Sequence, residues 1–239
     1  MTKKKILITN DDGIFSDGIK RLAEAAKEFG EVWVVAPNRQ YSAMSHSITL
    51  REAMDVFPYE FPVEGVHAFA AGATPADCVR FGICNIVKGK PDVVFSGINY
   101  GYNSGSDIQY SATVGAAMEA ASAGIHAIAF SENASDNHVV TDAYLSEIMR
   151  ELLEKPLEHN EIWNVNFPDC SLEELKGKCW NPSVAENAFY RDEFIEEPLP
   201  GGGVRLTVNG IYHENAPEGT DFRAIVDKYI SIGRVRNIH

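Results

Sequence analysis

The sequence predicts an α/β fold: a parallel sheet with helices on both faces, followed by an extension that contains hairpins. Short apolar runs alternate with segments of helical periodicity as far as about residue 167, a pattern typical of βαβ units. From about Cys170 the pattern changes, because Pro, Glu and Gly concentrate in the segment EFIEEPLPGGG and residues 204–208 then look like a strand. We therefore divide the chain into a core, residues 1–169, and a C-terminal extension, residues 170–239.

The first predicted elements are two strands, residues 6–9 and 31–36, with a helix over residues 17–29 between them. Apolar residues within that helix recur at i, i+3, i+4, i+7 and i+10, which is the spacing of one helical face. Ser16 or Asp17 can cap it. The chain thus enters the fold as a strand–helix–strand unit.

After a polar loop, the segment 66–70 is predicted to be a strand and a helix follows it. Thr74 is a suitable N-cap for this helix, Pro75 a suitable first residue and Asp77 the acidic residue of the first turn. The remaining core elements are predicted as strands over 92–95, 125–130 and 162–167, a helix from about Thr113, and a helix over 142–154 capped by Thr141.

Composition limits the classes of partner. The 239 residues carry 21 Lys and Arg against 34 Asp and Glu, a formal net charge of −13, which disfavours binding to a nucleic-acid duplex. A compact ligand such as a nucleotide remains compatible if a divalent cation supplies positive charge. No apolar run approaches the roughly 18 residues of a membrane span, and the four cysteines have no C-x-x-C spacing. We expect a cytoplasmic protein that does not bind membranes.

Two adjacent carboxylates, Asp11 and Asp12, follow the first predicted strand. An Asp-Gly pair is common in plain turns, but here a helix follows, so the pair lies at the sheet edge where α/β proteins bind ligands. Together with Asn99 and a hydroxyl from the loop 38–47, the two carboxylates form an all-oxygen ligand set. Such a set suits Mg²⁺ or Mn²⁺ better than Zn²⁺.

A glycine-rich segment between a strand and a helix is the second candidate feature. Gly97, Gly101 and Gly105 recur every four residues, in neither a G-x-G-x-x-G nor a Walker A pattern. Such a segment serves either as a plain turn or as a set of N–H groups facing an anion at a helix N-terminus. The polar residues within it are Asn99, Asn103, Ser104, Ser106, Ser111 and Thr113.

A metal beside a phosphate cradle favours phosphoryl hydrolysis. The sequence lacks the G-x-S-x-G nucleophile elbow of serine hydrolases. Its two Asp residues are adjacent, whereas phosphatases of the haloacid-dehalogenase type need Asp-x-Asp. Both classes are therefore disfavoured. His46 lies in the candidate loop and is interpreted either as an acid or base or, preferably, as a solvent-exposed histidine. A Rossmann-type oxidoreductase is disfavoured because no G-x-G-x-x-G follows the first strand.

Five motifs in this order resemble the SurE family of nucleotide phosphatases. They are TNDDG-x3-DG, NRQYSAMSHSIT, TPADCV, SGIN-x-G-x-N-x-G and YS-x-TVGAAMEA. The resemblance is strong over about the first 130 residues and weaker at Gly219–Asp221. It implies a Rossmann-like three-layer sandwich with a mostly parallel sheet. It also implies a divalent-metal-dependent 5′-nucleotidase, with 3′-nucleotides and polyphosphate as further substrates, and C-terminal arms exchanged in homodimers or homotetramers.

The resemblance also implies roles for individual residues. One divalent ion per subunit, Mg²⁺ or Mn²⁺ with Ca²⁺ as a substitute in crystals, is expected on Asp11, Asp12, Ser42 and Asn99; the choice of Ser42 over Ser45 or Ser47 rests on the resemblance alone. The catalytic residues are expected to be Asp11, Asp12 and Asn99. The phosphate-binding residues are expected to be Gly101, Asn103, Ser104, Gly105, Ser106, Ser111 and Thr113.

The chain departs from the family pattern at three alanines, because Ala43, Ala73 and Ala112 stand where the family usually has glycine. Each adds a Cβ near the expected site, and alanine is strained wherever the backbone needs a positive φ. These substitutions motivate an alternative function, a nucleotide- or phosphate-binding regulatory protein with weak or lost turnover. The preferred base, the phosphate position and the nucleophile are left open.

Overall fold

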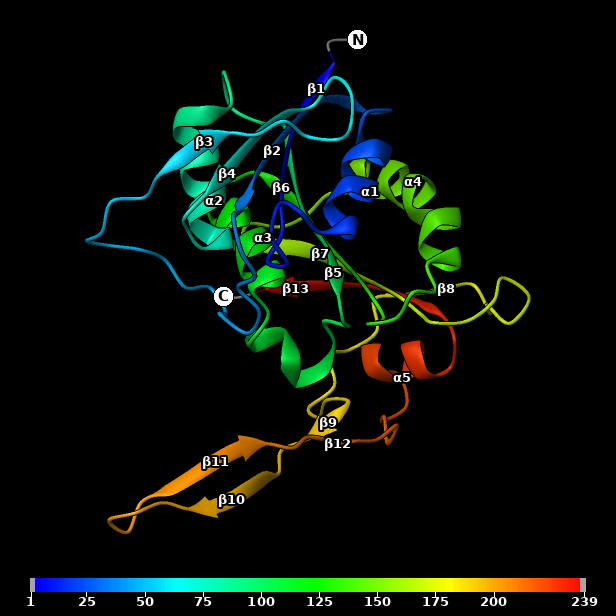
Figure 1. The fold of residues 1–239 in the computed structure, drawn as a ribbon. Coiled ribbons are helices and arrows are strands. Elements are labelled where there is room, and N and C mark those ends of the chain that lie inside the picture. The colour runs from blue at the N-terminus through cyan, green and yellow to red at the C-terminus, as the bar shows by residue number, and fades with distance from the viewer. Residues whose placement is uncertain (1–2, 237–239) are drawn as a thin grey trace.

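The computed structural model describes residues 3–236, and its centre is a nine-stranded sheet in the order β3-β4-β2-β1-β5-β6-β7-β13-β8 (Figure 1). Neighbouring strands from β4 to β7 run parallel. These six strands are β1 (Lys4–Thr9), β2 (Gly30–Pro37), β4 (His67–Ala71), β5 (Val93–Tyr100), β6 (His126–Glu132) and β7 (Glu161–Phe167). Their carboxyl ends therefore meet at one edge of the sheet.

The outer strands make the sheet mixed. At one side β3 (Val56–Pro58) is antiparallel to β4, and at the other β13 (Ile230–Arg236) is antiparallel to β7 and parallel to the last strand, β8 (Lys178–Trp180). The C-terminal strand thus returns to the main sheet and lies between two strands that precede it in sequence.

Helices cover both faces, which gives the three layers expected from the sequence (Figure 1). Helices α1 (Asp17–Ala26) and α4 (Val139–Leu153) pack on one face, and α2 (Pro75–Phe81) and α3 (Ala112–Ser122) pack on the other. Side chains alternate across a strand, so Ile6 and Ile8 of β1 enter the core under α1 and α4, whereas Leu7 enters the core under α2 and α3. None of the helices in the described residues is long and apolar enough to cross a membrane.

The helix caps predicted from local sequence are correct for some helices and wrong for others. Thr74 caps α2, accepting a hydrogen bond from the Asp77 N–H at 3.1 Å, as predicted. Ser16 precedes α1 but makes no capping bond, because its hydroxyl accepts from the Asn10 amide at 2.8 Å. The prediction that Thr141 caps the fourth helix is wrong: α4 begins at Val139, and Thr141 is buried in its first turn.

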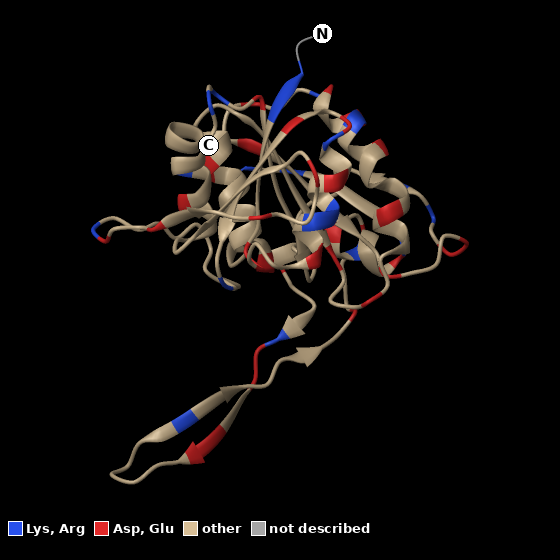
Figure 2. Cartoon of the chain, turned by 45° about the horizontal axis from the view of Figure 1, so that its top comes forward, with Lys and Arg blue, Asp and Glu red and all other residues tan. Residues whose placement is uncertain are grey.

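The chain after residue 170 contains both a projecting arm and parts of the body. The arm is a ribbon formed by β9 (Tyr190–Arg191), β10 (Phe194–Pro198), β11 (Val204–Val208) and β12 (Ile211–Tyr212), and it extends away from the sheet (Figure 1). Helix α5 (Asp221–Val226) then leads into β13. Figure 2 shows acidic and basic residues interspersed over the body and a few on the arm. A boundary at residue 169 stays a prediction.

Candidate functional site

The candidate site lies at the carboxyl ends of the two central strands. β1 and β5 are neighbours, and the chain leaves them toward opposite sides, to β2 and to β6. Asp11 and Asp12 follow β1, and Asn99 is near the end of β5. In open α/β sheets the crevice at such a reversal is the usual ligand position.

Hydrogen bonds bring the loop after β2 to this crevice. The Tyr41 N–H donates to the Asp11 carbonyl at 2.7 Å. Farther along the loop, Ser45 donates through its N–H to the Tyr110 carbonyl at 2.9 Å and through its hydroxyl to the Gln109 carbonyl at 2.7 Å. The loop is therefore held between the Asp pair and the segment that precedes α3.

A cavity of about 350 Å³ opens between these segments. Asp11, Ser42 and Asn99, three of the four expected metal ligands, line it, and the fourth, Asp12, is next in the chain to Asp11. The remaining lining residues are Ala43, Tyr100, Asn103, Asp107, Tyr110 and Ser111. Neither Ser45 nor Ser47 lines this cavity.

Asp11 is a buried carboxylate with little compensation for its charge. Its side chain is 3% exposed, and Oδ1 accepts a 2.5 Å hydrogen bond from the Thr113 hydroxyl. Burial raises the pKa of Asp11 to about 7, the Thr113 bond opposes that rise, and the neighbouring Asp12 adds to it. A cation in the cavity would stabilise the ionised form.

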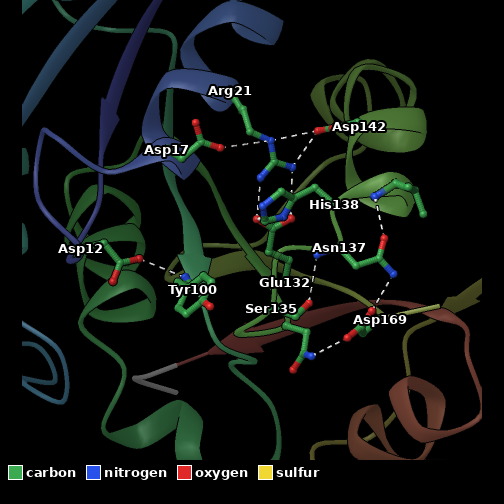
Figure 3. A network of polar contacts seen from close by, with 12 residues as sticks. Asp12, Asp17, Arg21, Tyr100, Glu132, Ser135, Asn137, His138, Asp142 and Asp169 are labelled. Atoms are coloured by element: carbon green, nitrogen blue, oxygen red, sulfur yellow. Dashed lines mark hydrogen bonds and ion pairs between the residues drawn. The ribbon is translucent and has the colours of Figure 1, made fainter. Parts of the chain in front are cut away.

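Asp12 is tied to two neighbouring segments. Its Oδ2 accepts from the Tyr100 N–H at 3.0 Å (Figure 3), and Oδ1 lies 3.4 Å from the Gln40 amide nitrogen. Burial raises the pKa of Asp12 as well, against the effect of these two contacts. Gln40 also donates to the Ser42 hydroxyl at 3.0 Å. Gln40, which sequence reasoning did not single out, thus connects two of the expected metal ligands.

The donor chemistry of the cavity fits a hard divalent ion. Asn99 donates through its side-chain nitrogen to the Gly101 carbonyl at 2.7 Å, so its amide oxygen stays available as a ligand. Within residues 3–236 no group of three or more His, Cys, Asp or Glu side chains is placed to share a metal. A metal here would therefore depend on two carboxylates together with amide and hydroxyl oxygens, which suits Mg²⁺ or Mn²⁺.

The backbone of the glycine-rich segment is already engaged within the protein. The Gly101 N–H donates to the Glu132 carbonyl at 2.9 Å, and the Gly105 N–H donates to the Asp221 carboxylate at 2.9 Å. The Asn103 and Ser106 N–H groups also have protein acceptors. These four N–H groups are not free to surround a phosphate in this conformation, unlike the cradle that the sequence suggested.

Some side chains of this segment line the cavity, and others are bonded or buried within the protein. Asn103 lines the cavity but donates through its amide to the Ser131 hydroxyl at 2.8 Å, and Ser104 is 1% exposed. Ser111 lines the cavity and caps α3, and Thr113 contacts Asp11. The first turn of a helix has N–H groups without intrahelical partners, so the start of α3 is the part of this segment best suited to an anion.

A second cavity of about 300 Å³ adjoins the first beyond Asp12. Its far wall is an ion-pair network that sequence reasoning missed (Figure 3). Arg21 contacts Glu132 at 2.6 Å and Asp142 at 2.7 Å, and the His138 Nδ1 lies 3.0 Å from the same Glu132 carboxylate. The network joins α1 to β6 and to the start of α4. Arg21 is 111 positions from Glu132 and 121 from Asp142, and local sequence carries no signal for these contacts.

The interpretation of His46 as a solvent-exposed loop residue is wrong. Its side chain is about one-quarter exposed, and Nε2 lies 2.7 Å from the Glu119 carboxylate on α3. The adjoining Gly115 explains how the loop lies so close to the helix, because a Cβ there would stand 2.5 Å from the Ser45 carbonyl oxygen. His46 therefore attaches the site loop to α3.

Of the three alanines singled out in the sequence, Ala43 has a strained backbone. Its φ is +58°, whereas neither Ala73 nor Ala112 is among the described residues with positive φ. We expect Ala43→Gly to raise the free energy of unfolding by about 0.5–1 kcal/mol, because relief of the left-handed strain exceeds the added flexibility of the unfolded chain. Urea denaturation measures this.

The matched control is Ala73→Gly, which relieves no strain and removes a buried methyl group. It should lower the free energy of unfolding by roughly 1 kcal/mol. Equal changes in the two variants would contradict the assignment of strain to Ala43.

The chain is similar in sequence and in structure to known proteins. The family model described as survival protein SurE matches residues 6–188. The chain is 39% identical to the 5′-nucleotidase SurE of Geobacter metallireducens over 235 residues, 95% of this chain and 89% of that protein. It is 39% identical to the 5′/3′-nucleotidase SurE of Klebsiella pneumoniae over 234 residues, 95% and 88% of the two chains. The crystal structure of the SurE protein from Aquifex aeolicus superposes with a TM-score of 0.82 at 34% identity, covering 97% of this chain and 93% of that one.

Proposed function

The chain belongs to the SurE family, and on that premise we propose that it is a divalent-metal-dependent phosphatase that hydrolyses nucleoside monophosphates to nucleoside and phosphate. The observation that carries the proposal is the cavity in which Asp11, Ser42 and Asn99 meet beside Asp12. Its described lining residues include neither Lys nor Arg. A phosphate dianion would meet carboxylates there, so a cation is needed for it to bind.

We propose that Asp11, Asp12, Ser42 and Asn99 hold one Mg²⁺ or Mn²⁺ per subunit, with Asp11, Asp12 and Asn99 as the catalytic residues. The bound ion would supply charge neutralisation and orientation of the phosphate. The protein's own contribution is to hold these oxygens in place: the Thr113 hydroxyl orients Asp11, the Tyr100 N–H and Gln40 orient Asp12, and the Gly101 carbonyl orients the Asn99 amide.

For the phosphate we propose a smaller set of direct contacts than the sequence suggested. Ser111 lines the cavity as the N-cap of α3, and a helix N-terminus suits an anion. We assign Thr113 to the same end of α3, acting through Asp11. Gly101, Asn103, Gly105 and Ser106 then keep the shape of the segment through their own hydrogen bonds. Ser104 is buried within the same segment.

The direct test is phosphate release from a panel of 5′- and 3′-nucleoside monophosphates and polyphosphate, each with Mn²⁺, Mg²⁺ or EDTA. We expect turnover of 5′-nucleotides with either metal and none with EDTA. Tight nucleotide binding without phosphate release would instead support the regulatory alternative. Release that is unaffected by EDTA would contradict the metal-dependent function.

We also propose that the arm mediates assembly into a homodimer or homotetramer. β10 and β11 form an isolated two-stranded ribbon, and Phe194, Leu206 and Val208 on it are all more than half exposed. Such a ribbon is marginally stable alone in water, and apolar side chains in this number favour burial against a partner.

We predict that replacing residues 193–209 with a short Gly-Ser turn converts the oligomer to a monomer, because the exposed apolar strands are removed. Light scattering coupled to size-exclusion chromatography measures the mass of both proteins. A parent protein that is itself monomeric, or a shortened variant that keeps the parent's subunit number, would contradict the role of the arm.

A reducing compartment suits the chain, and we propose the cytoplasm. Cys78, Cys84, Cys170 and Cys179 are all free thiols. Unpaired cysteines are typical of compartments in which thiols stay reduced.

A further inference from the structure

Asp107 shares the metal-site cavity but has no role in the assignment above. It lies on the short 3₁₀ helix Gly105–Gln109, between the glycine-rich segment and α3. Its neighbours in the cavity lining include Asp11 and Asn99. A third carboxyl group is therefore close to where the phosphate ester is expected.

The surroundings of this carboxyl group differ from those of the Asp pair. Asp11 accepts from the Thr113 hydroxyl and Asp12 from the Tyr100 N–H. Asp107 is partly buried, yet among the described residues no group donates a hydrogen bond to its carboxyl oxygens. Burial raises the pKa of Asp107, and the nearby carboxylate of Asp192, at the root of the arm, raises it further. These conditions favour the protonated form.

Hydrolysis of a nucleoside monophosphate creates a need for a proton donor. The leaving group is an alkoxide, which is strongly basic, so the P–O bond breaks more easily if its oxygen is protonated as it leaves. When two carboxyl groups of one site have environments that favour different protonation states, they suit different roles. An ion held by Asp11 and Asp12 would lower their pKa values, whereas Asp107 lies in the same cavity outside the expected ligand set and keeps a pKa raised by burial.

Resting on the proposed phosphatase function, we propose that Asp107 is the catalytic acid that protonates the leaving oxygen. As water adds to phosphorus, the bond from phosphorus to the leaving oxygen breaks and its electron pair stays on that oxygen. The carboxyl proton of Asp107 transfers to the oxygen, which gives a neutral alcohol. Asp107 is left as a carboxylate and regains a proton from water, while the attacking water gives up its proton to solvent.

Two other side chains near the site are less suited to this role. Tyr110 also lines the cavity, but it is 64% exposed and a phenol is a much weaker acid than a carboxyl group. His138 lines the neighbouring cavity beyond Asp12, where its Nδ1 faces Glu132. Asp107 is the carboxyl group in the same cavity as the expected metal ligands that has no other described partner.

Leaving-group basicity separates proton donation from other effects. We would compare kcat for adenosine 5′-monophosphate and the small alkyl ester glycerol 2-phosphate with kcat for p-nitrophenyl phosphate, whose leaving group needs no proton. Asp107→Asn is expected to lower kcat for both alkyl esters on the order of a hundredfold, but for the aryl ester by less than about threefold. Asp107→Glu should restore part of the loss, and Asp107→Ser provides a second variant if the Asn protein folds poorly.

The control is Asp136→Asn, which removes a carboxylate outside the metal-site cavity. Asp136 lines the neighbouring cavity, so its replacement should leave the ratio of alkyl to aryl activity unchanged. The Mn²⁺ dissociation constant, measured by electron paramagnetic resonance, should be the same in Asp107→Asn as in the parent.

Three results would overturn the role of Asp107: equal losses on alkyl and aryl esters, no loss on either, or weaker Mn²⁺ binding in Asp107→Asn. The last would make Asp107 a metal ligand. A parent protein that releases phosphate from no ester would overturn the proposed function itself.

Discussion

Asp12→Asn is expected to lower kcat for nucleoside monophosphates by at least about a hundredfold, because metal-ion stabilisation of the transition state is worth several kcal/mol. The substitution removes one ligand charge but keeps a side chain of the same size. Its amide oxygen can still accept from the Tyr100 N–H, which now bonds Oδ2. The fold should therefore persist, while kcat falls and the Mn²⁺ dissociation constant rises.

The companion variant Asp11→Asn separates function from stability. Asp11 is buried, and burial raises its pKa to about 7, so the ionised side chain is costly in the metal-free protein. Asn removes that cost, and the melting temperature of the metal-free protein should stay the same or rise while activity is lost. Such an opposition between stability and activity is expected at functional sites.

Asp17→Asn is the matched control for both variants. Asp17 is a few residues away, and its side chain is 69% exposed, 3.9 Å from Arg21. An exposed ion pair of this kind contributes less than about 1 kcal/mol, so activity and metal affinity should be unchanged. Full activity of the Asp11→Asn/Asp12→Asn protein, or of the parent in EDTA, would exclude the metal mechanism.

The sequence predicted the central fold well, because the evidence for it is local. Alternation of short apolar runs with helical periodicity predicted the parallel strands and the helices on both faces. The Thr74–Asp77 cap was predicted for the same reason, since its hydrogen bond spans three residues. The position of Asp11 and Asn99 at one sheet edge followed from the rule that parallel strands end together.

Long-range contacts explain most of what the sequence could not reveal. The spacing of glycines suggested a phosphate cradle, but two of these glycines permit close backbone approach. A Cβ at Gly97 would lie 2.3 Å from the Phe130 carbonyl oxygen, and one at Gly105 would lie 2.0 Å from the Asn187 carbonyl oxygen. No local pattern indicates which backbone will approach a glycine. The place of β13 in the main sheet is of the same kind, because its partners precede it by dozens of residues.

Asp221 illustrates how a distant residue can support the site. Its side chain is 4% exposed and accepts from the Gly105 N–H at 2.9 Å, the Ala185 N–H at 2.9 Å and the Phe222 N–H at 2.8 Å. Those bonds join the glycine-rich segment, the chain that leads to the arm, and α5. The carboxylate thus connects the predicted core with the predicted extension.

Asp221→Ala is expected to lower the free energy of unfolding by about 3 kcal/mol or more, because buried N–H donors would lose their acceptor. For a chain of this size that corresponds to a fall of roughly 6–12 °C in melting temperature. The control is Asp227→Ala, which breaks the 2.7 Å ion pair with Arg223 at the end of the same helix. Both side chains are about one-third exposed, so the loss should be about 1 kcal/mol or less.

The same measurement tests whether residues 170–239 unfold separately from the core. If the two parts are one cooperative unit, calorimetry should show a single transition that moves down in Asp221→Ala, and phosphatase activity should be lost at the same temperature. In Asp221→Ala, activity should be lost at a lower temperature than in the parent, because the segment from Gly105 to α3 would lose an attachment. Two transitions, of which only one moves while activity follows the other, would mean that the extension folds independently and that Asp221 does not support the site.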